Sequence, residues 1–155
     1  MTIYALSTGS GISGIAIIRV SGTKSKDILN LITKGKFPLE RVATLKKIID
    51  PDTDELIDEC IVIWFKKPNS YTGQDMIEIH SHGSKAVVHK LESILEKFEN
   101  CRVAEPGEFT KLAFHNNKIN LQKVESIGDL IAAETELQRK QALRIMSGTS
   151  SKKFN

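Results

Sequence analysis

The sequence lacks any hydrophobic run long enough to cross a membrane. Its longest apolar segment, residues 60–65, is far shorter than the roughly 20 residues that a bilayer-spanning helix needs. The first residues also lack the basic stretch and the long apolar segment of a secretory signal peptide. We therefore expect a cytoplasmic chain that makes no membrane contact.

Cysteine is scarce, because the 155 residues include only Cys60 and Cys101. Two cysteines, one in an apolar run and one at the start of a predicted strand, favour buried, reduced thiols over a disulfide framework. No Cys/His spacing typical of a zinc site occurs. The phosphate-binding pattern G-x-x-x-x-G-K-[ST] is also absent, which excludes a P-loop within this chain.

Excess charge of either sign is small, because 22 Lys and Arg residues against 19 Asp and Glu residues leave a formal net charge of +3. This excess does not by itself indicate nucleic-acid binding. Residues 139–155 contain basic but no acidic side chains, which leaves two hypotheses open, a solvated helix end and a nucleic-acid-binding patch. The overall composition, 40% hydrophobic and 26% charged, is that of a globular protein. The length predicts one domain, or one domain plus an extension.

Hydrophobic periodicity predicts an α+β fold with a mixed β-sheet and flanking helices. Stretches with β-branched residues or alternating polarity predict strands over 2–7, 15–20, 43–50, 58–65, 75–81 and 102–104. Apolar stripes predict one helix that reaches about residue 34 and another over 85–98, and Pro106, well suited to a first turn, predicts a third over 106–115. Thr23 or Ser25 can cap the first of these helices. The turn-rich residues 51–54 predict a hairpin.

The C-terminal part of the sequence predicts a long amphipathic helix over residues 121–146, with Asn120 as its cap. No later segment offers an apolar partner for the stripe of this helix. We expect either that another subunit covers the stripe or that the sequence is a piece of a longer protein.

Residues 9–14, GSGISG, match the pattern G-x-G-x-x-G. A dinucleotide site needs a helix after these glycines, so that the helix N-terminus meets the pyrophosphate. The residues that follow are β-branched and predict a strand. A flexible glycine connection between two strands is therefore the better interpretation.

Several charged side chains occur at positions where, if they are buried, a group of opposite charge or a hydrogen-bonding group must compensate them. Glu78 lies between two isoleucines in a predicted strand, and Arg19 follows an apolar run. Each is either an exposed or ion-paired residue or part of a pocket for a ligand of opposite charge. Lys118 lies in a helix-breaking loop, where ligand contacts are common. His80 and His82 could bind a metal on one strand face, but no third ligand stands at a telling spacing, so hydrogen-bonded loop or strand histidines are favoured.

Four segments in a fixed order make a family resemblance specific. They are residues 14–22 (GIAIIRVSG), 68–75 (PNSYTGQD), 78–83 (EIHSHG) and 104–110 (AEPGEFT). Together they resemble the N-terminal domain of the tRNA modification GTPase family MnmE/TrmE. Residues 114–124 (FHNNKINLQKV) resemble the connection into the helical domain of that family.

The resemblance implies a tetrahydrofolate-binding and dimerisation domain over residues 1–117, similar in fold to folate-dependent aminomethyltransferases. Residues 118–155 would then be the first part of an incomplete helical domain. The resemblance assigns the folate-binding roles to Arg19, Glu78 and Lys118 and assigns no catalytic or metal-binding residue. A carboxylate such as Glu78 can accept the adjacent N–H and NH2 groups of a pterin ring together, which agrees with that role.

The function implied by the resemblance is modification of the wobble uridine of tRNA at C5. The one-carbon unit would come from 5-formyl- or 5,10-methylene-tetrahydrofolate. The expected partners are a second copy of the chain, the flavoprotein MnmG (GidA) and tRNA. GTP and potassium would bind only in the GTPase domain of the family, which we expect beyond this chain, so whether the chain is an enzyme by itself stays open.

The sequence also departs from the family pattern. Gln74 and Glu105 replace the usual Glu and Arg, and Asn120 replaces the usual Asp. These departures and the missing GTPase domain motivate an alternative, a dimerisation or scaffold module with a degenerate pocket and no activity of its own.

Overall fold

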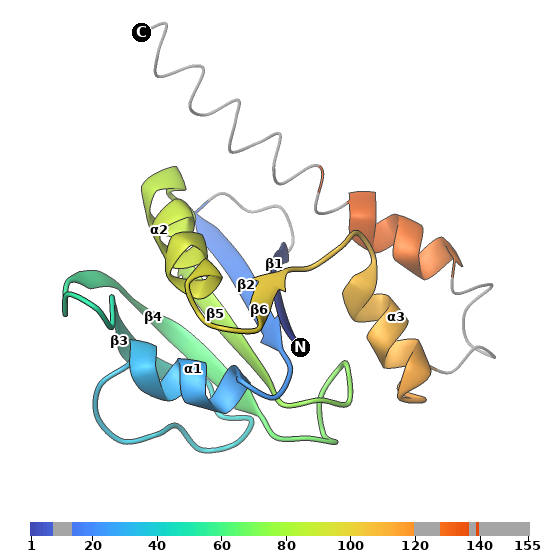
Figure 1. Cartoon of the computed structure of the whole chain (residues 1–155), viewed down its shortest axis with the longest axis horizontal. Helices are drawn as coiled ribbons and strands as arrows, with labels where there is room; N and C mark the ends of the chain where they lie inside the picture. The colour runs from blue at the N-terminus through green and yellow to red at the C-terminus, as the bar shows by residue number, and fades with distance from the viewer. Residues whose placement is uncertain (8–13, 120–127, 137–138, 140–155) are drawn as a thin grey trace, which may run out of the picture.

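The computed structural model describes residues 1–7, 14–119, 128–136 and 139. Within this part, six strands and three named helices form an α+β fold, with a further helical segment over residues 128–136 (Figure 1). The strands are β1 (Thr2–Ser7), β2 (Ile15–Ser21), β3 (Thr44–Ile49), β4 (Leu56–Phe65), β5 (Met76–His82) and β6 (Cys101–Val103). The helices are α1 (Ser25–Ile32), α2 (Lys85–Glu96) and α3 (Glu108–His115).

The strands form one mixed sheet in the order β3-β4-β5-β2-β1-β6. β1 and β6 pair in parallel, whereas the other neighbouring pairs are antiparallel. β2 and β5 therefore lie side by side in the middle of the sheet, although a helix, a hairpin and a loop separate them in sequence. This pairing sets Arg19 directly opposite Glu78.

One face of the sheet, here called the covered face, packs against α1 and α2 (Figure 1). The side chains in this layer are almost inaccessible to solvent, so the helices and the sheet share one apolar core. Its members include Ile28, Leu29 and Ile32 of α1, Leu91, Ile94 and Leu95 of α2, and Ile18, Val20, Val62, Ile77 and Ile79 of the strands.

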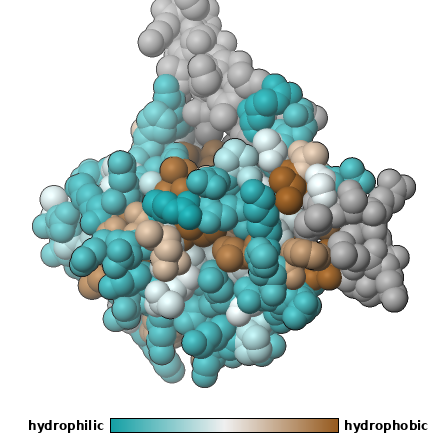
Figure 2. Space-filling view, turned by 45° about the vertical axis from the view of Figure 1, so that its right-hand side comes forward, coloured by the Kyte–Doolittle hydropathy of each residue, from teal (hydrophilic) through white to brown (hydrophobic). Residues whose placement is uncertain are grey.

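The opposite face, here called the open face, carries the alternate residues of the same strands, because side chains along a strand point to opposite sides in turn. α3 reaches only one end of it, where Phe109 packs with Ile3, Ala5 and Met76. The remaining part includes Arg19, Glu78 and His80 and partly exposed isoleucines of β2 and β4. On the side of the molecule that Figure 2 presents, hydrophilic residues dominate the surface and apolar residues form small patches.

Most predicted elements are confirmed within a few residues, including the hairpin of β3 and β4. The predicted cap of α1 is wrong. The residue before the helix is Lys24, and no side chain caps it. The Ser25 hydroxyl instead donates to the Asp75 carbonyl at 3.0 Å, which joins the start of the helix to the start of β5.

Two predicted segments lie partly outside the described residues. Of the predicted long helix over 121–146, residues 128–136 and 139 are helical, and the rest lies outside the described part of the chain, so a single long helix stays a prediction. Of the glycine segment 9–14, Gly14 is described. It is followed by the strand β2 rather than a helix, as the β-branched residues predict. The division of the chain at residue 117 also stays a prediction.

Both cysteines are buried and unpaired with each other, as predicted for reduced thiols. Cys60 belongs to the core of the covered face. Desolvation by burial, followed by repulsion from Asp58, raises the pKa of its thiol to about 12. The reactive thiolate form is therefore strongly disfavoured at neutral pH.

Candidate functional site

The centre of the candidate site is a carboxylate held between two donors on the open face. Glu78 Oε2 accepts from Arg19 Nε at 3.0 Å, and Oε1 lies 3.0 Å from His80 Nε2. The Glu78 side chain is only 15% exposed, against 31% for Arg19 and 27% for His80. A carboxylate has about four lone-pair positions. With one donor at each oxygen, Glu78 can still accept one further donor at each.

These contacts keep Glu78 ionised. The hydrogen bond with His80 is the largest influence, and together with the attraction of the Arg19 guanidinium it lowers the pKa of Glu78 below its ordinary value. Desolvation acts in the opposite direction but does not prevail. The site therefore presents an acceptor, not a proton donor, to any ligand near neutral pH.

A cavity of about 570 Å³ lies beside this carboxylate. The sheet supplies its floor, and two loops and the segment after α3 supply its walls. The lining residues are Arg41, Phe65, Asn69, Ser70, Tyr71, Met76, Glu78 and Lys118. Its volume is within the range of pockets that bind cofactor-sized molecules.

The loop before β5 is fixed to the sheet by hydroxyl groups. The Ser21 hydroxyl donates to Gln74 Oε1 at 2.7 Å and lies 2.7 Å from Thr72 Oγ1, which in turn accepts from the backbone N–H of Gln74. Since Ser21 has one proton and gives it to Gln74, Thr72 is the donor in their bond. The loop that carries Tyr71 is thus held at its base by β2.

The same loop is fixed to α3 on its other side. The Tyr71 hydroxyl lies 3.1 Å from Thr110 Oγ1, and Asn116 Nδ2 donates to the Thr72 carbonyl at 2.6 Å. Gly73 has a φ of 82°, and a Cβ there would lie 2.8 Å from the Cβ of Asn116. Glycine is therefore required by both the backbone conformation and the close approach of α3.

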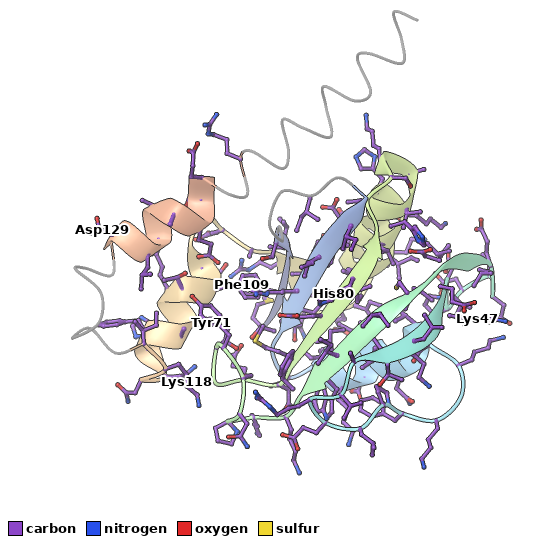
Figure 3. All side chains as sticks on the ribbon, turned by 180° about the vertical axis from the view of Figure 1, so that it is seen from behind. Lys47, Tyr71, His80, Phe109, Lys118 and Asp129 are labelled. Carbon is purple, nitrogen blue, oxygen red and sulfur yellow. The ribbon has the colours of Figure 1, made fainter. Side chains whose placement is uncertain are left out.

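Lys118 reaches the cavity because α3 ends just before it. Asn117 has a left-handed φ of 58°, and the backbone N–H of Lys118 donates to the Ala113 carbonyl at 2.8 Å. Figure 3 shows Tyr71 and Lys118 between the sheet and α3, with His80 over the middle of the sheet. The exposed Lys118 ammonium forms no ion pair with any described carboxylate.

The structure therefore brings the three predicted residues together, but only two of them line the cavity. Glu78 and Lys118 line the cavity, whereas Arg19 lies behind, against Glu78 and under the Tyr71 ring at 5.6 Å from its centroid. Sequence reasoning missed Arg41 and Phe65, which line the same cavity. No local pattern marks these two residues, because the loop and strand that carry them meet only through tertiary packing.

The second predicted histidine has a separate partner. His82 Nδ1 lies 2.7 Å from Asp58 Oδ1, and its backbone N–H donates to Asp58 Oδ2 at 2.9 Å. Within the described residues, no three His, Cys, Asp or Glu side chains are grouped as a metal site would require. Hydrogen-bonded strand histidines, the interpretation that the sequence favoured, describe both positions.

Two of the three departures from the family pattern can be placed. The Gln74 amide oxygen accepts the Ser21 hydroxyl, a bond that a carboxylate oxygen could also accept. Glu105 is exposed, and its backbone N–H donates to Glu108 Oε1 at 2.9 Å. Neither side chain belongs to the cavity lining. Asn120 lies outside the described residues.

The fold and the cavity together define a class, an α+β domain with a cofactor-sized cavity on the open face of a mixed sheet. Comparison with known proteins narrows this class. Residues 2–118 match the family described as "GTP-binding protein TrmE N-terminus". The chain belongs to this family, as its ordered segments predicted.

Bacterial relatives that share one name, "tRNA modification GTPase MnmE", support the family assignment. The chain is 63% identical over 155 residues to the "tRNA modification GTPase MnmE" of Pelagibacter ubique (strain HTCC1062). It is 47% identical over 154 residues to the protein of that name in Rickettsia typhi (strain ATCC VR-144 / Wilmington). These alignments cover 100% and 99% of the chain but 35% of each relative, so the chain spans about a third of their length. Among the described helices, none has the length and apolar character needed to cross a bilayer.

Proposed function

We propose that this chain binds a reduced folate in the cavity beside Glu78 and serves as the folate-binding part of a tRNA modification system. The observation that carries the proposal is the mostly buried, ionised Glu78 carboxylate, which bonds one donor at each oxygen and lines a cofactor-sized cavity. The name shared by the relatives, tRNA modification GTPase, gives the system in which such a cofactor would act.

The chemistry of a pterin suits this wall of the cavity. Its ring presents an adjacent N–H and NH2, which two oxygens of one carboxylate can accept side by side. Arg19 keeps the carboxylate charged and oriented. Lys118, which pairs with no carboxylate in the described part of the chain, supplies a cation for ring oxygens or for a negatively charged part of the ligand. When bound, 5-formyl- or 5,10-methylene-tetrahydrofolate would supply the one-carbon unit for C5 of the wobble uridine.

The remaining parts of the machinery are proposed from family membership. A flavoprotein of the MnmG (GidA) type and tRNA would join this domain in the cytoplasm, and GTP with potassium would bind a separate GTPase domain. The open face supports a homodimer, because Ile15 and Leu45 are 58% and 60% exposed there and Ile61 and Ile63 are partly exposed. Such apolar side chains on an uncovered sheet are typical of an association surface.

Calorimetric titration with 5-formyltetrahydrofolate tests the binding proposal. We expect wild-type protein to bind and Glu78→Gln to lose roughly 2–5 kcal/mol of binding free energy, because the amide replaces one acceptor oxygen with a donor. Lys118→Gln should also weaken binding, and it should leave the fold intact because Lys118 is exposed and forms no ion pair in the described structure. Glu59→Gln, at an exposed position of β4, is the matched control and should bind like wild type.

Equal binding by wild-type protein, Glu78→Gln and Lys118→Gln would contradict the proposal, and so would no binding by any of them. The second candidate function, a dimerisation or scaffold module with a degenerate pocket, is supported by the exposed apolar residues of the open face. Sedimentation velocity with and without 5-formyltetrahydrofolate separates the two. A dimer that neither binds nor responds to the folate would favour the scaffold.

A further inference from the structure

The cavity has a second charged wall, at the end opposite to Glu78. Arg41 and Asn69 lie there, and the Arg41 guanidinium donates from Nη1 to the Asn69 carbonyl at 3.1 Å. Its carbon Cζ lies 5.6 Å from the centroid of the Phe65 ring. Arg41 forms no ion pair with any described carboxylate, so its charge is available to a ligand.

The position of Arg41 is fixed by the backbone as well as by the ring. Its φ is 63°, a left-handed conformation that an arginine rarely adopts. The backbone N–H of Arg41 donates to the Trp64 carbonyl at 2.8 Å. The preceding residue, Glu40, forms an isolated parallel β-bridge with Trp64. The loop is thereby held beside the end of β4, with the guanidinium over Phe65.

The sheet register gives the separation between the two walls. Glu78 and Met76 are two residues apart on β5, Met76 pairs with Phe65 on β4, and Arg41 lies beside the end of β4. Two residues along a strand and two strand spacings across correspond to about 12 Å between the backbones of Glu78 and Arg41. An elongated ligand with a donor-rich ring at one end and an anion at the other matches this separation.

We propose that Arg41 binds the carboxylate groups of the glutamate tail of a folate and so determines preference for glutamylated over tail-less folates. This inference rests on the proposed function, because it places the pterin ring at Glu78. The floor between the two walls consists of Phe65 and Met76, which suits the apolar aromatic linker of a folate. A guanidinium fork, here already aligned over an aromatic ring, matches the geometry of a carboxylate.

The test compares two ligands that differ only in the tail, 5-formyltetrahydrofolate and 5-formyltetrahydropteroate, by calorimetric titration. We expect wild-type protein to prefer the glutamylated ligand about fivefold. Arg41→Gln should reduce this ratio to about one, because it weakens 5-formyltetrahydrofolate more than 5-formyltetrahydropteroate. Lys66→Gln, an exposed cation near the same loop that does not line the cavity, should keep the wild-type ratio.

The possible failures are distinguishable. If wild-type protein binds neither ligand, the proposed function fails and the inference fails with it. If both ligands bind wild-type protein and Arg41→Gln keeps the preference, only the role of Arg41 is overturned. The same holds if Arg41→Gln weakens both ligands equally, because this would mean that Arg41 supports the loop rather than binding the tail.

Discussion

The covered face and the open face are built from alternate residues of the same strands, yet they differ in burial and in chemical character. On β2, Ile18 is inaccessible beneath α1 and α2, whereas its neighbours Ile17 and Arg19 point to the other side and stay partly exposed. The covered face is purely apolar at its centre. The open face mixes isoleucines with the cluster of Arg19, Glu78 and His80. The covered face thus contributes the main apolar core, whereas the open face keeps a charged cluster partly accessible to solvent.

The division also explains how a charged cluster can be placed in the middle of a sheet. Arg19 and Glu78 are opposite each other on adjacent strands, so each compensates the desolvation of the other. His80 completes the arrangement from the same strand. The main apolar core lies on the covered face, so the polar cluster can be changed without opening that core.

The largest difference between the two faces is expected at two neighbouring positions of β2. Ile18→Ala removes buried methyl groups beneath the helices and leaves a cavity, so we expect a loss of about 2–5 kcal/mol in the free energy of unfolding. Ile17→Ala makes the same chemical change on the open face and should cost less than about 1.5 kcal/mol. Urea denaturation followed by circular dichroism measures both. Equal losses would mean that the open face is packed as tightly as the covered one.

A smaller effect is expected at the loop that closes the cavity. Gly73→Ala places a Cβ 2.8 Å from the Cβ of Asn116 at a left-handed φ, so we expect a loss of about 1–3 kcal/mol in stability and weaker folate binding. Gly35→Ala is the matched control, because its φ is 92° but its Cβ would meet nothing closer than the Lys46 ammonium at 3.7 Å. The difference between the two variants isolates the contact with α3. If both lose the same stability, the contact with α3 does not hold the loop.

The sequence alone could predict those features that depend on local alternation. A period of two in β5 places Ile77 and Ile79 on one side and Glu78 and His80 on the other, and this division is observed. The capping of α1 could not be predicted, because the Ser25 hydroxyl finds a more distant acceptor, the Asp75 carbonyl, that only the fold supplies.

The same limit applies to the candidate site. Arg19, Glu78 and Lys118 were found through family segments and through their unusual surroundings in the sequence. Arg41 follows no apolar run and belongs to no recognised segment, so its approach to Phe65 depends on the bridge between its loop and β4. Residues that enter a cavity through tertiary pairing of a loop leave no periodic or compositional signal.

The smallest expected effect concerns two carboxyl groups, one on each side of the sheet, whose pKa values shift in opposite directions. Contacts with His80 and Arg19 lower the pKa of Glu78 on the open face, whereas desolvation raises the pKa of Glu92 on α2, which packs over the covered face. As the pH falls through the ordinary glutamate pKa, about 4.3, towards the lower folded pKa of Glu78, the unfolded chain takes up the proton first. The stabilisation from Glu78 is therefore complete above this range and lost below it.

For Glu92 the sign is reversed, because the folded protein takes up its proton before the unfolded chain does. Glu92 therefore gains stability for the fold as the pH falls from its raised folded pKa towards the ordinary value. Measured as the free energy of unfolding in urea from pH 7 to pH 3, Glu78→Gln should make the acid loss of stability shallower than in wild type, and Glu92→Gln should make it steeper. If the two variants change the slope in the same direction, the difference that we draw between these two carboxyl environments is wrong.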